Sequence, residues 1–245
     1  MKKRKKRKKQ QKEKSNVLKY SEINIKNLHK IQTNINKISP HPKRVKIEAI
    51  TKTLSQEAIQ SAYKNKLWII GENKVQETIQ KTKQFKKPNK LKFHFIGHLQ
   101  TNKTKKAVKT YDVIETVDRE KLANKINSCA KKEDKKQKIF IQINISNNQK
   151  QSGINKEDAL SLIKKTAKMK NIIICGLMAI GPNTTNKTTT NTQYKEIYKL
   201  HRKIKLKHKS IKELSIGMSG DYKLALKNGA TIIRLGSILF GKKSE

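Results

Sequence analysis

Residues 213–241, ELSIGMSGDYKLALKNGATIIRLGSILFG, contain the pattern that decides the fold. Two apolar runs, Glu213–Met218 and Thr231–Phe240, lie on either side of a segment with helical spacing of its apolar residues. Ser219 and Asp221 are residue types that begin helices, so we expect a helix between the two runs. Two short buried strands joined by a helix form a unit in which both strands run in the same direction.

Six more apolar runs of this kind precede the pair. They are Val45–Lys52, Leu67–Gly71, Lys92–Gly97, Asp112–Val117, Ile139–Ile145 and Ile172–Ile180. Their nearly continuous apolarity is typical of strands that are buried on both faces of a parallel sheet. Eight strands alternating with helices belong to the α/β class and predict a single (β/α)8 barrel of the TIM type. A doubly wound open sheet is the alternative.

The segments between the runs have the apolar periodicity of amphipathic helices. Their apolar faces are Ala58, Ile59, Ala62 and Tyr63; Leu122, Ala123 and Ile126; Ala159, Leu160, Ile163 and Ala167; and Tyr194, Ile197, Tyr198 and Ile204. Ser55 and Asp118 can cap the first two helices. Apolar residues spaced from Leu28 to Ile38 predict an extra helix before the first strand. We expect the Thr- and Asn-rich residues 183–192 to form a loop.

The composition is strongly basic, with a formal net charge of +41. The excess is spread over nearly the whole chain, together with many Ile and Asn residues, as a coding bias would produce. A polyanion-binding surface is the alternative. We expect residues 1–14 to be a solvated, disordered tail, with a polyanion contact as the alternative, and residues 15–245 to form the barrel domain. No aromatic-rich RNA-binding motif is visible, so we expect no specific nucleic-acid partner.

Several other classes of protein are disfavoured. No apolar stretch has the length of a membrane span, and the basic start is not followed by the apolar segment of a signal peptide. Cys129 and Cys175 lie in no CxxC motif or Cys/His cluster, which argues against a disulfide framework or a metal site. Cys175 lies in an apolar run and is expected in the core. We therefore expect a cytoplasmic protein without membrane attachment.

Polar and glycine residues follow several of the predicted strands. Barrels of this type have their sites at the carboxyl ends of the strands. The candidates are Lys52 after the first run, Asn73 after the second, His98 after the third, Met218, Ser219 and Gly220 after the seventh, and Arg234, Gly236 and Ser237 in the eighth. We expect these residues to surround one site.

The pairs Ser219–Gly220 and Gly236–Ser237 are typical of a phosphate site. Such sites in these barrels use the loops after strands seven and eight together with the start of a helix. Glycine lets a phosphate approach backbone N–H groups closely, and serine adds a hydroxyl donor. The alternative is that both pairs are ordinary turn and capping residues.

Lys52 is one lysine among many, and its position sets it apart. A lysine at the carboxyl end of a barrel strand can be partly desolvated, which lowers its pKa and frees an amine to attack an aldehyde. An ordinary surface lysine is the alternative. Asn73 and His98 can hydrogen-bond a ligand ring, although His98 can equally support neighbouring residues or cap a helix. His94, within the strand, is expected to be a packing residue.

Six motifs together resemble the pyridoxal phosphate homeostasis proteins, a family with the barrel of the alanine racemase N-terminal domain. The motifs are Ala49–Thr53 (AITKT), Gly71–Glu77 (GENKVQE), His94–Lys103 (HFIGHLQTNK), Gly176–Met178 (GLM), Leu214–Asp221 (LSIGMSGD), and Ile233–Ser237 (IRLGS) with Phe240–Gly241. The resemblance extends from about residue 20 to the C-terminus, so it covers the whole predicted barrel.

The resemblance implies a role for each candidate. Lys52 is implied to hold pyridoxal 5′-phosphate (PLP) as a Schiff base, Asn73 to lie beside the cofactor ring, and the two serine–glycine pairs to hold the phosphate. Arg234 is implied to face the pyridine nitrogen, where a guanidinium donates a hydrogen bond and keeps that nitrogen unprotonated. The ring is then a poorer electron sink, which disfavours transamination and decarboxylation.

Three functions compete on this reading, namely PLP homeostasis, amino-acid racemisation and nucleic-acid binding. The resemblance favours a protein that binds PLP, buffers it and can deliver it to PLP-dependent apo-enzymes. A racemase of the related fold takes its second base from a C-terminal domain of the partner subunit, and this sequence ends at Glu245, soon after the eighth run. We therefore expect weak side activity at most, and a monomer.

Two positions depart from the family pattern. Thr51 stands where the family has a serine before the lysine, and residues 146–150 lack the acidic residue that follows the family's fifth strand. The basic tail is additional. None of these changes removes an implied cofactor contact, but any surface function of the fifth-strand loop is put in doubt.

Overall fold

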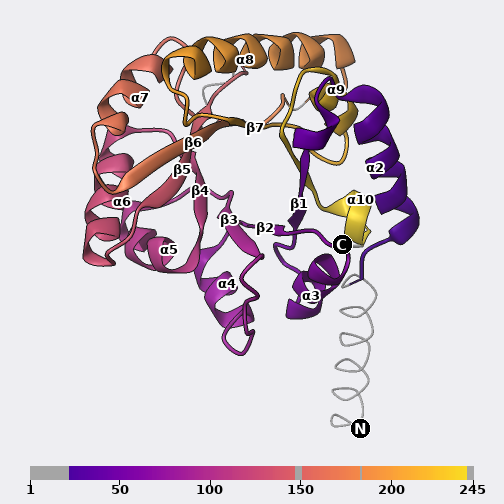
Figure 1. Cartoon of the computed structure of the whole chain (residues 1–245), viewed down its shortest axis with the longest axis horizontal. Helices are drawn as coiled ribbons and strands as arrows, with labels where there is room; N and C mark the ends of the chain where they lie inside the picture. Colours follow the sequence, from indigo (N-terminus) through magenta and orange to yellow (C-terminus); the bar gives the residue numbers. More distant parts are fainter. Residues whose placement is uncertain (1–21, 147–150, 183, 242–245) are drawn as a thin grey trace, which may run out of the picture.

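The computed structural model describes residues 22–146, 151–182 and 184–241, and its strands form a closed barrel (Figure 1). The strands are β1 (Lys46–Ile50), β2 (Ile69–Glu72), β3 (Lys92–Phe95), β4 (Val113–Val117), β5 (Gln137–Ile143), β6 (Ile172–Ala179), β7 (Glu213–Ser215) and β8 (Ile232–Leu235). Each strand pairs in parallel with the next, and β8 closes the barrel on β1. The expected barrel is confirmed, and the open sheet is excluded.

Helices surround the strands in Figure 1. They are α2 (Ile25–Ile38), α3 (Gln56–Lys64), α4 (Val75–Lys81), α5 (Thr104–Thr110), α6 (Glu120–Lys132), α7 (Ala159–Ala167), α8 (Lys187–Lys207), α9 (Tyr222–Lys227) and α10 (Ser237–Phe240), with the 3-10 turns η1 (Pro42–Arg44) and η2 (Thr101–Lys103). The extra N-terminal helix is α2, which buries Leu28, Ile31 and Ile35 as its periodicity predicts. Because all strands are parallel, their carboxyl ends lie at one mouth of the barrel and their amino ends at the other.

The main core lies between the strands and the helices. Alternate strand residues such as Ala49 and Ile70 are fully buried and belong to this layer, and the residues between them point into the barrel. A smaller apolar cluster of Val113, Phe140, Met178 and Ile232 is separate from the main core. The barrel is therefore filled by side chains, as is typical of the fold, and its two mouths are where ligands can approach the strand ends.

Two segment predictions near the end of the chain are wrong. The eighth run is not one strand, since β8 ends at Leu235 and the apolar residues after Gly236 form α10. A short apolar run cannot reveal such a change, because strand and helix are equally apolar there. Residues 187–192 belong to α8 and not to a loop. Asn186 begins this helix, and its side-chain oxygen accepts the N–H groups of Thr188 and Thr189.

The helix-capping predictions have mixed outcomes. Asp118 does not cap α6, since Arg119 occupies the N-cap position and donates through Nη1 to Asp118 Oδ1 at 2.6 Å. Ser55 precedes α3 at the predicted position, without a side-chain capping bond. Asp221 and Asn228 flank α9 as expected. The short helices α4 and α5 are not predicted by the sequence pattern.

Two predictions fall on residues outside the description, and one about Cys175 is wrong. The basic tail, residues 1–14, and residues 147–150 of the loop after β5 lie outside the described residues. Cys175 is only half-buried, so it is not the core residue that we expected. Across the described segments, every helix falls short of the length or apolarity that crossing a membrane requires.

Candidate functional site

Lys52 lies in the turn after β1, two residues beyond Ile50, and its side chain is exposed. The partial desolvation expected for this amine is therefore not found. Thr53 has a φ of 62°, in the left-handed region that a β-branched residue rarely adopts. Such a turn persists only when surrounding contacts fix it, so those contacts also determine where Lys52 stands.

Charged side chains of β2 and α4 fix this turn. Lys81 Nζ donates to the Thr51 carbonyl at 2.8 Å and to Glu72 Oε1 at 2.6 Å, and the Lys81 side chain is only 6% exposed. The Thr51 hydroxyl donates to the same Glu72 oxygen at 2.6 Å. On the other side of the lysine, the Thr53 N–H donates to Glu77 Oε1 at 2.7 Å, and that oxygen is 3.7 Å from Lys81 Nζ. The backbone is thus held on both sides of Lys52, while the amine of Lys52 stays accessible.

Ser219 joins the loops after β7 and β8. Its Oγ accepts the N–H groups of Gly236 and Ile238, both at 3.3 Å. Gly220 is exposed, and no atom lies within 4 Å of the position that a Cβ would occupy. Ser237 is exposed as well. We call these five residues the cradle, because Ser219 ties them together while Gly220 and Ser237 leave open space where an anion can approach their N–H and hydroxyl groups.

The cradle lies beside the end of β1. A Cβ on Gly236 would stand 3.4 Å from Ile50 Cβ, so the two strand ends are in contact. Lys52 follows Ile50 by two residues, which places its amine at the same mouth. Met218, directly before the cradle, is 41% exposed, and its N–H donates to Asp221 Oδ1 at 2.6 Å. The first, seventh and eighth strand ends therefore meet as the sequence predicts.

Arg234 points into the barrel from β8 and is 4% exposed. Its Nη1 donates to the carbonyl and the hydroxyl of Ser215, both at 2.8 Å, and its Nη2 donates to the Ala179 carbonyl at 2.8 Å. These bonds use three of the five N–H donors of a guanidinium. Arg234 is thus a fixed buried cation that has donors left for a ligand.

Asn73 and His98 follow β2 and β3. Asn73 Oδ1 is buried and has no donor within the described residues, which is costly unless a ligand or water supplies one. Gly97 packs on the Asn73 backbone, since a Cβ there would stand 2.2 Å from the Asn73 carbonyl oxygen. His98 is exposed, and it is not a helix cap, because Gln100 occupies the N-cap of η2. The ligand contacts of both residues stay predictions.

A second polar group lies inside the barrel. Glu48 of β1, His94 of β3 and Glu115 of β4 are buried, and each offers a side-chain atom within 4.8 Å of the others. His94 Nδ1 is 2.6 Å from Glu115 Oε1, so His94 does more than pack. The Ser215 hydroxyl accepts from Arg234 and lies near enough to Glu115 to lower the pKa of that carboxyl. The signal for this group is visible in the sequence as a glutamate within each of two apolar runs.

The two carboxyl groups have opposite pKa shifts. Burial raises the pKa of Glu48 well above its ordinary value, and the charge of Glu115 raises it further, while Arg234 opposes both. Burial also raises the pKa of Glu115, but its hydrogen bond to His94, the charges of His94 and Arg234, and Ser215 lower it overall. A Glu48 that keeps its proton beside an ionised Glu115 agrees with both shifts. The neighbouring guanidinium disfavours a metal ion at these ligands.

Glu48→Gln is expected to stabilise the protein increasingly as the pH rises above about 4.3, the ordinary glutamate pKa. A raised pKa means that folded Glu48 holds its proton where the unfolded chain loses it, so wild-type stability falls with pH through this window. Glutamine has the size of the protonated side chain and carries no charge, so it avoids this cost. Urea denaturation at several pH values measures the gain.

Glu157→Gln, at an exposed glutamate on the surface, is the matched control and should change stability little at any pH. A Glu48→Gln gain that does not grow with pH would contradict the raised pKa of Glu48. The lowered pKa of Glu115 acts in the opposite sense. Ionised Glu115 stabilises the fold at pH values above the ordinary glutamate pKa. This stability is lost only as the pH falls through the lowered pKa of Glu115 in the folded protein, which lies below the pH window of the test.

Residues 26–244 match the sequence model of the alanine racemase N-terminal domain. A relative from Pasteurella multocida named "Pyridoxal phosphate homeostasis protein" is 36% identical over 224 residues, which cover 89% of this chain and 96% of the relative. The chain belongs to the pyridoxal phosphate homeostasis protein family. A relative of the same name from Aquifex aeolicus is 33% identical and covers 81% of this chain and 87% of its own length.

Solved structures of this family have the same fold. PipY of Synechococcus elongatus is 29% identical to this chain, with 88% of this chain and 99% of PipY aligned. The TM-score is 0.80 for the structure without PLP and 0.78 for the structure with PLP bound. Alanine racemase of Clostridium difficile, at 20% identity and a TM-score of 0.73, shares the fold, with 91% of this chain and 58% of the racemase aligned.

Proposed function

We propose that the protein binds pyridoxal 5′-phosphate, carries it as a Schiff base on Lys52, and serves vitamin B6 homeostasis in the cytoplasm with little or no catalysis. One observation carries the proposal. The Ser219 hydroxyl joins the loops after β7 and β8 into an open cradle beside the strand end that presents Lys52. The names of the relatives and the PLP-bound structure of PipY support the same ligand.

The residues present fit this cofactor. The cradle offers N–H and hydroxyl donors to a phosphate, and the exposed amine of Lys52 can reach an aldehyde at the same mouth. The buried Asn73 oxygen without a donor can accept from a ring substituent. We assign His98 and Met218, both exposed at this mouth, to the rim around the ring.

Arg234 limits the reactions that a bound PLP could support. Bound PLP supplies an aldehyde that condenses with amines and a ring that withdraws electrons from them. A guanidinium stays protonated, so Arg234 can only donate to the ring nitrogen and leaves it without a proton. Ser215 and Ala179 hold the guanidinium in place. The ring is then a weaker electron sink, which disfavours transamination and decarboxylation.

Racemisation as a weak side activity is the second candidate, and the fold shared with alanine racemase favours it. It needs a second base. The tyrosine near the cradle, Tyr194, is fully buried, and its hydroxyl donates to Asp221 at 2.8 Å. Burial raises the pKa of Tyr194, and the charge of Asp221 raises it further, so this tyrosine stays protonated. It is not a competent base.

The exposure of Lys52 makes delivery of the cofactor to another protein feasible. An exposed Schiff base can be exchanged by an incoming amine, so we propose PLP-dependent apo-enzymes as recipients. The protein is also proposed to act as a monomer.

The visible spectrum of the purified protein tests the proposal. Protein loaded with PLP is expected to show the absorption band of a Schiff base, and borohydride should remove the band and fix the cofactor covalently. Peptide mapping should then find it on the peptide that contains Lys52. Absence of the band at saturating PLP would refute the carrier. Racemisation of alanine at ordinary enzyme rates would favour the second candidate instead.

A further inference from the structure

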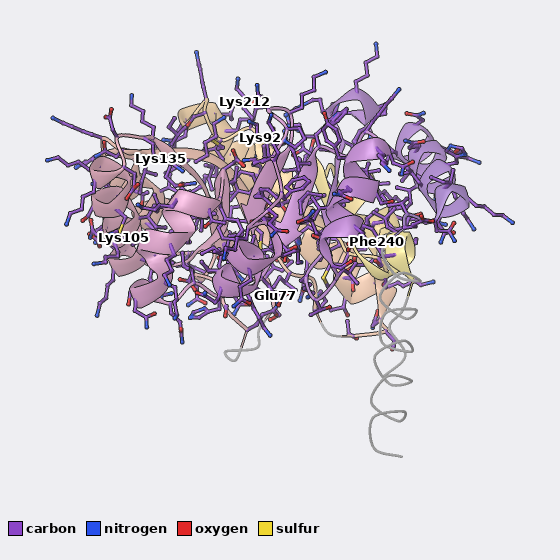
Figure 2. The ribbon with its side chains drawn as sticks, turned by 90° about the horizontal axis from the view of Figure 1, so that it is seen from below. Glu77, Lys92, Lys105, Lys135, Lys212 and Phe240 are labelled. Atoms are coloured by element: carbon purple, nitrogen blue, oxygen red, sulfur yellow. The ribbon has the colours of Figure 1, made fainter. Side chains whose placement is uncertain are left out.

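A cavity of about 1240 Å³ opens at the amino ends of the strands, the mouth opposite the proposed PLP site. Its lining includes the first residues of several strands, among them Lys46, Lys92, Val113 and Ile232. Figure 2 shows Lys92, Lys135 and Lys212 toward one edge of the molecule, with Glu77 and Phe240 toward the other. Because Glu77 contacts the Lys52 turn and Phe240 ends α10, the cavity and the PLP site lie at opposite ends.

Ammonium groups dominate the lining. Four of its lysines, Lys66, Lys136, Lys138 and Lys212, have no ion pair or hydrogen bond through Nζ to any residue that the structure describes. Ammonium groups that line the same cavity repel each other, so an anion that binds among them is stabilised. Lysine is a common binder of phosphate groups.

The other lysines of the lining are occupied. Lys46 pairs with Glu213 at 2.6 Å, and Lys92 lies 3.9 Å from Asp112. Lys135 donates to the Val108 carbonyl at the end of α5, at 2.6 Å. The carboxylates in the lining are therefore already engaged, and they do not neutralise the four lysines without partners.

The inner part of the cavity is apolar. Val113, Phe140 and Ile232 belong to the small cluster inside the barrel, and half-buried Cys175 packs against them. A basic rim around an apolar floor suits an anion that also has an apolar or planar part. Inorganic phosphate would leave this floor uncovered. A nucleic-acid strand follows an open groove, whereas this cavity is closed below by the barrel interior.

We propose that this cavity binds a nucleoside triphosphate, with the phosphates among the four lysines and the base on the apolar floor. Small-molecule sites are commonly about 300–1,000 Å³ in volume, so a molecule of this size fits with water around it. The site is separate from the proposed PLP site, because it lies at the opposite mouth of the barrel. Its natural role would be to report nucleotide supply to a protein that handles PLP.

The protein contains its own reporter for this test. Trp68 is the single tryptophan, lies on the cavity lining and is 37% exposed. Titration of the full-length protein with ATP at physiological salt is expected to change Trp68 fluorescence saturably, with one site by calorimetry. Lys136→Glu/Lys138→Glu/Lys212→Glu should weaken binding by about tenfold or more.

A matched variant separates the site from the general charge of the protein. Lys105→Glu/Lys164→Glu/Lys195→Glu changes the net charge equally at exposed lysines of α5, α7 and α8 that line no part of the cavity. It should keep ATP affinity within about twofold. Equal weakening by both triple variants would overturn the proposal, because binding would then follow net charge alone.

Two further probes complete the test. Inorganic triphosphate binding as tightly as ATP would overturn the role of the apolar floor, and single-stranded RNA that outcompetes ATP through the same lysines would replace the proposed ligand class. The cavity variant should keep its circular dichroism and the PLP absorption band of the wild type. That band reports on the carrier function separately, so failure of one proposal does not hide the outcome of the other.

Discussion

Lys52→Ala is expected to abolish the Schiff-base absorption band and covalent retention of PLP after borohydride reduction. The reason is chemical, since the amine of Lys52 is the nucleophile proposed to bond the aldehyde, and alanine has none. Stability should stay within about 0.5 kcal/mol of the wild type, because the side chain is exposed and forms no hydrogen bond in the described structure. Spectroscopy, mass analysis after reduction and urea denaturation measure these outcomes.

Two variants make this result specific. Lys74→Ala removes an exposed lysine just after Asn73, at the neighbouring strand end, and should leave the band unchanged. Lys52→Arg keeps the charge without a reactive amine, so it should retain PLP weakly through the cradle and lose it on dialysis. A Lys52→Ala protein with the wild-type spectrum would refute the assignment, and a band lost only in Lys74→Ala would move it to that residue.

The sequence predicts the barrel because the signal is repeated. Eight apolar runs with helices between them are compatible with few architectures. An error at the end of one element does not change the number of predicted strands. The end of β8 shows where this reasoning stops. Residues from Thr231 to Phe240 are apolar throughout, and only the backbone after Gly236 reveals that the last four residues turn into α10. Exact ends depend on local contacts that periodicity does not report.

The candidate site is predicted only in part. Motifs locate Lys52 and the cradle residues because strand ends converge in any such barrel. The contacts that hold them are long-range, such as Lys81 with Thr51 and Glu48 beside Glu115. Nothing in the local sequence distinguishes Lys81 from the many exposed lysines. A charged residue in an apolar run, as at position 48, is the one local sign of a buried polar partner.

Lys81→Met is expected to lower the free energy of unfolding by about 3–5 kcal/mol, the cost of leaving a buried ion without its partner. Glu72 is fully buried, and Lys81 donates to its Oε1 at 2.6 Å. Burial already raises the pKa of Glu72, and the charge of Lys81 is the largest opposing effect. Without that charge the folded pKa rises further, so the loss of stability should grow as the pH increases above about 4.3.

The same change should loosen the Lys52 turn, because the Thr51 carbonyl loses its donor. Lys83→Met, at an exposed lysine just beyond α4, is the control and should shift stability by less than about 0.5 kcal/mol.

Adding Glu72→Gln to Lys81→Met removes the unpaired buried charge of Glu72, so it should recover stability at neutral pH. The double variant also keeps the test measurable if the single variant does not fold. Recovered stability with faster loss of PLP would show that the ion pair positions Lys52 as well as stabilising the barrel. If the double variant loses PLP no faster than the wild type, the role of Lys81 is limited to stabilising the structure.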